Sequence, residues 1–352
     1  MGAAMAAEPP TPALRHSHDA EPGIVRQRAG RGFRYLDARG KPVRAAATLE
    51  RIRRLAIPPA YTQVWICAQA NGHLQASGRD ARGRKQYRYH PKWVRMRSDN
   101  KFDRIVAFGK VLPALRRQVR TDLALPGLPR AKVLAIVVAV MGRTLARIGN
   151  DAYARDNHSY GLTTLRNRHL ENAGQGQARL RFRGKSGQAQ AMVIDDRHLS
   201  GLVRRCQQLP GQLLFQYRDE DGKVRPVGSS DVNAYLRQAT GDDFSAKDFR
   251  TWGGTLVALR ELAQRPLPDA GSERALAELQ NQVIAAVAAM LGNTPAVCRK
   301  SYIDPCVFEG WRDGRLGAMQ SLRGPRQWEA AALRFLRSAH RGNGGLSRSA
   351  SR

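Results

Sequence analysis

The chain has 352 residues, which is enough for about two domains with a buried core. It carries 59 lysine and arginine residues against 29 acidic ones, so its formal net charge is +30. This excess predicts a polyanionic partner, with nucleic acid as the first choice and an anionic membrane surface as the second. The longest apolar run, Val133 to Met141, is nine residues long and too short to span a membrane. High arginine and alanine contents can also reflect a GC-rich genome, so charge by itself does not establish the partner.

The cysteines and the N-terminus give no sign of export or of metal binding. The four cysteines form no CxxC pair, and the histidines do not combine with them at zinc-ligand spacing. We expect reduced intracellular thiols and no metal. Ala6 stands where a myristoylation signal needs Ser or Thr, and no charged start precedes an apolar core as in a secretory signal. A cytoplasmic protein is therefore expected.

The first part of the chain predicts a β-rich domain. Residues 1–22 are rich in alanine, proline and histidine and are predicted to form a disordered tail. Residues 23–95 alternate between β-branched or aromatic segments and glycine-rich turns, which predicts a small, mostly antiparallel domain. The expected strands are Gly32–Lys41 (turning at Arg39 and Gly40), Tyr61–Ala68, His73–Ser77 and Lys85–Tyr89.

Helical periodicity predominates in residues 96–340, which follow a basic polar link. Arg130–Ile148 is apolar on most faces, which predicts a helix at the centre of this second domain. A β-hairpin is expected from Ala178–Arg183 and Gln190–Ile194. Residues 341–352, rich in glycine, serine and arginine, are predicted to be a second disordered tail. The other expected helices are Asp196–Gln208, Ser230–Thr240, Ala246–Gln264, Glu273–Leu291 and Gln327–Ser338.

Tyr302 is placed at the end of a short predicted helix. Asn293 or Thr294 can cap this helix, Pro295 suits its first turn, and Asp304-Pro305 ends it. A side chain at a helix end before a proline can be mobile and aimed at a substrate. The simpler alternative is a half-buried surface tyrosine.

Two cations lie at predicted helix ends. Arg250 follows a capping box of Ser245 and Asp248, so it lies near a helix N-terminus that favours an anion. Lys247 would share its face and touch an adjacent phosphate. Arg147 closes the apolar helix and needs an anionic or carbonyl partner. The alternatives are a solvated helix arginine at 250 and compensation of the helix dipole at 147.

Lys185 and Tyr153 complete the candidates in the second domain. Lys185 stands at the tip of the turn Gly184–Gly187, from which a lysine can swing into a site as a general acid. A surface turn lysine is the alternative. The Gly-Lys-Ser sequence is not a nucleotide-binding loop, because the first glycine of that motif is missing and a hairpin follows. Tyr153 can donate a hydrogen bond to a phosphate.

The first domain has a basic and aromatic segment from Gly78 to His90. Arg84 and Lys85 suit phosphates, and Gln86 can read a base edge. In an ideal strand Tyr87 and Tyr89 share one face while Gln86 lies on the other. A basic, solvated strand is an equally good interpretation of these residues.

Together, a tyrosine, two arginines and a lysine are what a metal-free enzyme needs to break a phosphodiester. The tyrosine attacks phosphorus, the arginines stabilise the developing negative charge, and the lysine protonates the departing oxygen. Storing the bond energy in a phosphotyrosine removes any need for a nucleotide cofactor.

Four segments in this order resemble the type IB DNA topoisomerases of the poxvirus-like bacterial branch, and the resemblance covers about residues 30–310. The segments are Gly78–Tyr89, Tyr160–His169, Lys247–Gly253 and Gly292–Tyr302. The resemblance implies an α+β fold: a small β-rich N-terminal domain and a larger, mainly α-helical catalytic domain with a β-hairpin, in a C-shaped clamp around duplex DNA.

By the same resemblance, Tyr302 is the nucleophile that forms a 3′-phosphotyrosyl link. Arg147 and Arg250 match the transition-state arginines, and Lys185 matches the general acid. Gln86, Tyr87 and Tyr89 match DNA-contacting positions. The expected protein is a nucleoid-associated monomer that relaxes supercoils on double-stranded DNA without ATP, metal, other cofactor or membrane.

One position departs from the poxvirus pattern, which has histidine where this chain has Asn293. Asparagine can still donate to a non-bridging oxygen but cannot become charged, and one such donor is typically worth about 2.7–4 kcal/mol. Two other functions remain open from the residues. A tyrosine recombinase uses a related constellation, although the β-rich first domain argues against it, and a non-enzymatic DNA-compacting protein would account for the charge but not for the order of the motifs.

Overall fold

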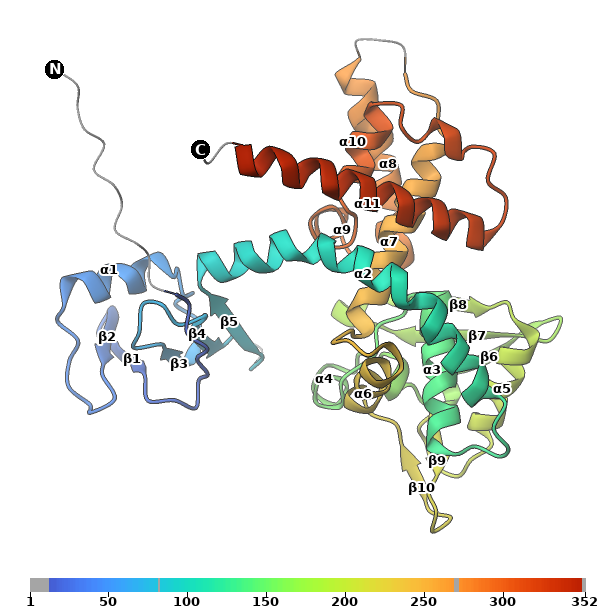
Figure 1. The fold of residues 1–352 in the computed structure, drawn as a ribbon. Coiled ribbons are helices and arrows are strands. Elements are labelled where there is room, and N and C mark those ends of the chain that lie inside the picture. The colour runs from blue at the N-terminus through green and yellow to red at the C-terminus, as the bar shows by residue number, and fades with distance from the viewer. Residues whose placement is uncertain (1–12, 82, 269–271, 350–352) are drawn as a thin grey trace. The chain divides into compact units, whose positions relative to one another are not determined.

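The computed structural model describes residues 13–81, 83–268 and 272–349, leaving aside the side chains of 95–101, 103, 152–153 and 342–349. The chain divides into two compact units, Met1–Lys101 and Phe102–Arg352. The first is built on a β-sheet and the second is mainly helical, so the protein is a mixed α and β structure (Figure 1). The division falls within the long helix α2 (Pro91–Leu123), a few residues after the predicted boundary at 95/96.

The first unit is a five-stranded antiparallel sheet in the order β2-β1-β3-β4-β5. Its core joins Ile24, Val64, Ile66 and Ala76 of the sheet to Ile52 of a helix, α1. The predicted strand segments are confirmed, whereas β1 and α1 were not expected. The elements are β1 (Ile24–Ala29), β2 (Gly32–Leu36), α1 (Ala46–Arg54), β3 (Thr62–Ile66), β4 (Leu74–Arg79) and β5 (Lys85–Tyr89).

The predicted N-terminal tail is wrong for residues 13–22, which pack on this sheet. Arg15 forms a parallel bridge with Gly72, and its carbonyl accepts the His73 N–H at 2.8 Å. Ser17 is only 4% exposed, and its hydroxyl donates to the Leu74 carbonyl at 3.0 Å. Backbone pairing with residues more than 50 positions later in the chain holds this segment in place. The polar composition of the segment gave no sign of that pairing. Residues 1–12 lie outside the described part.

The second unit is organised around α3 (Arg130–Thr144), which is buried on most of its faces. A three-stranded antiparallel sheet, in the order β6-β7-β8, contains the predicted hairpin. Its strands are β6 (Leu170–Gly174), β7 (Gln177–Arg183) and β8 (Ala189–Ile194), and a small hairpin is formed by β9 (Gln216–Arg218) and β10 (Val224–Pro226). The further helices are α4 (Asp151–Asn157), α5 (Arg197–Gln207), α6 (Ser229–Thr240), α7 (Ala246–Ala263), α8 (Glu273–Leu291), α9 (Pro295–Ser301), α10 (Cys306–Arg312) and α11 (Pro325–Ser349).

Two predicted ends in this unit are corrected. The apolar helix stops at Thr144, because Leu145 adopts a left-handed conformation (φ 53°), so Arg147 lies in the following loop. The predicted tail from residue 341 is wrong up to Ser349, since α11 continues through it. Its apolar face, which includes Trp328, Phe335 and Leu336, is buried in the core.

No single helix in the described ranges is long and apolar enough to cross a membrane. The bent pair α8 and α9, at 95° to each other, reaches the required length and hydropathy only together. Val283, Ile284 and Val287 of α8 are buried in the core of the unit.

A buried polar pair offers a test of this core. The Tyr235 hydroxyl donates to Asp122 at 2.6 Å, and both residues are less than 9% exposed. Because a hydrogen bond to a charged group contributes about 1.5–3 kcal/mol, we expect Tyr235→Phe to lower the free energy of unfolding by that amount. Urea denaturation measures it. Tyr217→Phe is the control, since the Tyr217 hydroxyl makes no hydrogen bond with the described residues; equal losses in both variants would contradict the expectation.

Candidate active site

A pocket in the second unit brings together side chains from distant parts of the sequence. Arg147, Lys185, Lys247, Arg250 and Tyr302, which the sequence singles out, all line it. The pocket is also lined by Ile148, Gly149, Asn150, Ser159, Tyr160 and Ala246. A tyrosine thus faces four cations in one cavity, a composition suited to a negatively charged group.

Arg250 is the most buried of these cations, with 4% of its surface exposed. It lies in the first turns of α7, where Asp248 accepts the Ser245 N–H at 2.8 Å, as a capping box predicts. Its guanidinium donates to the carbonyl of Leu145, the capping residue just after α3, and, at 2.8 Å, to that of Leu291 at the end of α8. Carbonyls at helix C-termini carry partial negative charge, so they hold the buried cation in place.

Arg147 is fixed by the turn that follows α8. Its guanidinium donates to the Gly292 carbonyl at 2.9 Å and to the Oδ1 of Asn293. Arg147 therefore stabilises the C-terminus of another helix, not of the helix that precedes it. Asn293 does not cap α9; the Thr294 hydroxyl does, by accepting the Val297 N–H at 3.4 Å.

Two buried donors near these arginines lack an oxygen or nitrogen acceptor among the described residues. They are the Nε of Arg250 and the Nδ2 of Asn293, which among those residues meets only the weakly accepting sulfur of Cys298. An unsatisfied buried donor typically costs about 1–3 kcal/mol, so such groups are typical of sites that bind an acceptor from outside. Cys298 lies in the same region, where burial raises the pKa of its thiol against the opposing effect of the Arg250 charge. The thiol therefore stays protonated beside the site.

Close backbone contacts link the loop that carries Arg147 to the hairpin that carries Lys185. Gly161 lies against the loop after α3, where a Cβ would come within 2.6 Å of the Arg147 carbonyl. The next residue, Leu162, donates its N–H to that carbonyl at 2.9 Å. Tyr160 donates its N–H to Arg183, at the base of the β7–β8 hairpin, at 2.7 Å. The exposed Lys185 at the hairpin tip is thus tied to the loop that carries Arg147.

Tyr302 is half-buried at the end of α9 and its backbone is held by α7. Its carbonyl accepts from the Thr255 hydroxyl at 3.3 Å, and a Cβ at Gly254 would come within 2.6 Å of the same oxygen. The Arg250 guanidinium carbon lies 5.1 Å from the centre of the tyrosine ring. The backbone of Tyr302 is therefore fixed, and its ring lies beside the buried positive charge of Arg250.

The candidate DNA-binding residues of the first unit lie on or just before β5. Tyr87 and Tyr89 are exposed and stack with ring centres 6.2 Å apart. Arg84 and Gln86 both donate to Asp80, at 2.8 and 3.0 Å. The side chains of Arg84 and Gln86 are thus hydrogen-bonded within the first unit.

Lys85 is paired in the same way, with Asp19 at 2.5 Å. The hydrogen bond from Lys85, with one from Ser77, holds the pKa of Asp19 below its ordinary value. The interaction also raises the pKa of Lys85. Asp19 lies in the segment that the sequence suggested to be a tail, so this partner was missed.

Two further points complete the account of the predicted residues. Tyr153 lies in α4, but its side chain is outside the described part. Sequence reasoning missed Tyr160 and Ser159 as pocket residues. Tyr160 begins one of the four segments that carry the family resemblance, so its place in that segment could have identified it as a site residue.

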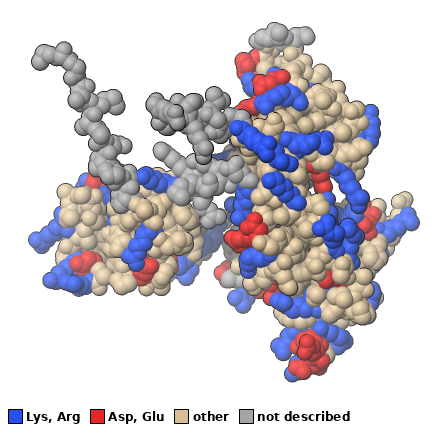
Figure 2. All heavy atoms as spheres, in the orientation of Figure 1, with Lys and Arg blue, Asp and Glu red and all other residues tan. Residues whose placement is uncertain are grey.

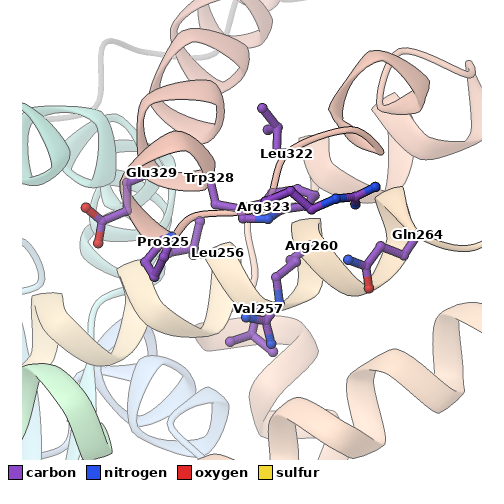
Figure 3. A pocket seen from close by; sticks show the side chains of 9 residues that line it. All are labelled: Leu256, Val257, Arg260, Gln264, Leu322, Arg323, Pro325, Trp328 and Glu329. Carbon is purple, nitrogen blue, oxygen red and sulfur yellow. The ribbon is translucent and has the colours of Figure 1, made fainter. Parts of the chain in front are cut away.

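A second hollow lies at the other end of α7 (Figure 3). Its side chains come from α7 on one side and from the start of α11 and the preceding loop on the other. It is lined by Leu256, Val257, Arg260, Gln264, Leu322, Arg323, Pro325, Trp328 and Glu329. None of the predicted site residues is among them, so the chemistry is assigned to the first pocket.

Positive charge is spread widely over the face of the protein that Figure 2 shows. On the face shown in Figure 2, lysine and arginine side chains cover parts of both units, with fewer acidic groups between them. The fold and the pocket together define an enzyme that acts on a polyanion.

Comparison with known proteins identifies the family. Residues 90–308 match the catalytic core of eukaryotic DNA topoisomerase I, and residues 32–80 match the N-terminal domain of bacterial DNA topoisomerase IB. The chain is 33% identical to DNA topoisomerase 1B of Acanthamoeba polyphaga mimivirus over 80% of this chain and 85% of the viral one. It is 23% identical to DNA topoisomerase 1B of Vaccinia virus (strain Copenhagen) over 72% and 76%, respectively. The chain belongs to the type IB DNA topoisomerases, isomerases that relax supercoiled DNA.

Proposed function

We propose that Tyr302 relaxes DNA by attacking a backbone phosphate in the first pocket. The phenolic oxygen loses its proton to solvent and bonds to phosphorus, the bond to the 5′ oxygen breaks as that oxygen takes up a proton, and a 3′-phosphotyrosyl link holds the nicked strand. The free strand end rotates, and the 5′ oxygen then attacks the link to reseal the strand. Because the phosphotyrosine retains the bond energy, ATP is not required, and the arginines and the lysine supply the charge stabilisation and the proton for which other enzymes use a metal ion.

The observation that carries this proposal is the convergence of Tyr302 with Arg147, Lys185 and Arg250 in one pocket. The arginines stabilise the extra negative charge on the non-bridging oxygens, and their helix-end contacts fix them before substrate arrives. The unsatisfied Nε of Arg250 is a donor available for this charge. Asn293 contributes its buried Nδ2 in the same way, as a neutral donor.

Lys185 acts as the general acid to the departing 5′ oxygen. Its place on a hairpin tip gives the side chain reach, while the contact between Tyr160 and Arg183 anchors the hairpin base. Lys247, exposed at the start of α7, neutralises a neighbouring phosphate.

The first unit supplies further DNA contacts through β5 and the turn before it. Arg84 and Lys85 bind phosphates, while Gln86, Tyr87 and Tyr89 meet bases or sugars. We propose that both units close on the duplex as a C-shaped clamp, that one chain suffices, and that the enzyme works on the nucleoid in the cytoplasm. The family membership and the net charge of +30 support this arrangement.

Removing the nucleophile should abolish relaxation. We expect Tyr302→Phe to leave supercoiled plasmid unrelaxed in EDTA without ATP, while the wild type relaxes it, because phenylalanine has no oxygen to bond to phosphorus. Gel electrophoresis of plasmid topoisomers measures this. Tyr217→Phe is the matched control and should stay active. Relaxation by Tyr302→Phe would contradict the assignment.

Removing the general acid should slow cleavage in a way that depends on the leaving group. Because general acid catalysis typically contributes about 10²–10⁴-fold, we expect Lys185→Ala to reduce the single-turnover cleavage rate by that factor. A substrate with sulfur in place of the bridging 5′ oxygen should restore the rate, since a thiolate leaves without a proton. Lys223→Ala, at another hairpin turn, is the control. An equal defect on both substrates would assign Lys185 a different role.

Releasing Lys85 should strengthen DNA binding. Asp19→Asn removes the carboxylate that pairs with Lys85, so one more cation can meet a phosphate. The slope of log K against log salt concentration should steepen by up to about 0.9, as expected for one phosphate. Fluorescence anisotropy of a DNA duplex at several salt concentrations measures it. Glu220→Gln, at an exposed residue for which the described residues show no ion pair, changes the net charge equally; an equal effect of both variants would attribute the change to net charge.

A further inference from the structure

A buried carboxylate lies two residues after Tyr302. Asp304 is 2% exposed, and one of its oxygens accepts the Cys306 N–H at 3.1 Å. The other oxygen lies 2.8 Å from the Nε2 of His340 on α11. The relaxation chemistry described above uses neither Asp304 nor His340.

The segment from Tyr302 to Asp304 is held from two sides. On one side the Thr255 hydroxyl of α7 donates to the Tyr302 carbonyl at 3.3 Å and accepts the Asp304 N–H at 3.1 Å. On the other side the carboxylate of Asp304 meets His340. The backbone that carries the nucleophile is thus fixed between two helices that are distant in sequence.

Helix α11, which carries His340, is held by contacts with several other helices. It packs against α7 and α10 (Figure 1), and the Phe335 ring fills the space beside Gly310, where a Cβ would come within 2.3 Å of it. Arg116 of α2 makes two contacts of 2.6 Å with Glu329 of the same helix. His340 lies further along the same helix, and 16% of its side chain is exposed. It lies beyond residues 90–308, which match the catalytic core of the family.

The geometry favours a hydrogen bond over a metal site. The ligand atoms of Asp304, Cys306 and His340 lie within 4.8 Å of one another, so the set resembles three zinc ligands. Tetrahedral zinc with bonds of about 2.0–2.1 Å places two nitrogen or oxygen ligands about 3.3 Å apart. The distance of 2.8 Å between the Asp304 and His340 atoms is shorter and is ordinary for a hydrogen bond.

We propose that His340 is a positioning residue for the nucleophile, acting through its hydrogen bond to Asp304. A buried carboxylate that loses a donor is drawn toward water or another donor. Such a movement would shift the Tyr302 backbone two residues away. Because a displacement of about 1 Å at a reacting group can reduce a rate by about 10²-fold, His340 would affect the rate through the position of Tyr302. This inference rests on the proposed role of Tyr302.

Three substitutions of His340 test the proposal. We expect His340→Leu to lower the single-turnover rate of covalent adduct formation about 10–100-fold, with the Kd for duplex DNA unchanged. His340→Gln, whose amide can reach and donate to Asp304, should restore most of the rate. His340→Asn, equally polar but shorter, should not. The exposed His198 of α5 gives the matched control His198→Leu, which should behave as the wild type.

The same measurements distinguish the outcomes that would contradict the role of His340 from those that would contradict the proposed function. Wild-type rates in both His340→Leu and His340→Asn would overturn the proposal, as would a defect in His340→Gln equal to that of His340→Leu. A stoichiometric zinc content in the purified wild type that is lost in His340→Leu would replace the hydrogen bond with a metal site. Thermal unfolding identifies variants that do not fold, and the comparison of Gln with Asn then decides between folded proteins. Adduct formation by Tyr302→Phe would instead refute the proposed function.

Discussion

Arg250 joins the ends of two helices that are far apart in the sequence. Its guanidinium donates to the carbonyl of Leu145, the residue that follows α3, and to that of Leu291, the last residue of α8, and it is almost completely buried. A buried guanidinium is tolerated only where it is hydrogen-bonded and balanced by negative charge. Two helix C-termini supply both through their carbonyls and dipoles without a carboxylate. The cation is therefore held in place and not neutralised by an acid, which leaves its charge available to an anionic substrate.

The same constraint extends to the rest of the pocket. Arg147 binds the turn after α8 and Arg250, from the start of α7, binds the end of α8, so the loop after α3, the end of α8 and the start of α7 are joined at one place. Tyr302 follows that turn within ten residues and lies beside Arg250. The position of the tyrosine thus depends on helix ends that are fixed by the arginines, which couples the stability of the core to the geometry of the site.

Local signals in the sequence were enough to predict most elements of the fold. The bounds of α8 follow from the Ser272 cap before it and the left-handed Gly292 after it, both of which are local. Contacts between distant segments could not be predicted. Residues 13–22 have the composition of a tail, yet backbone pairing with Gly72 and His73 orders them. The candidates Tyr302, Arg147, Lys185 and Arg250 could be named from their local settings, but not the Leu145 and Leu291 carbonyls that hold Arg250.

The cations of the two units are held by different partners, and this has a physical consequence. In the pocket, Arg147 and Arg250 donate to neutral carbonyls and an amide, so no carboxylate among those contacts must be displaced when a phosphate enters. On the first unit, Arg84 and Lys85 are paired with Asp80 and Asp19, so a phosphate must compete with a carboxylate for each. Internal acids moderate the affinity of the first unit for a phosphate, whereas the contacts of Arg147 and Arg250 with carbonyls and an amide leave their positive charge uncancelled by those partners. Moderated affinity on the first unit and strong stabilisation in the pocket suit an enzyme that must bind DNA, release it, and use its binding energy in the transition state.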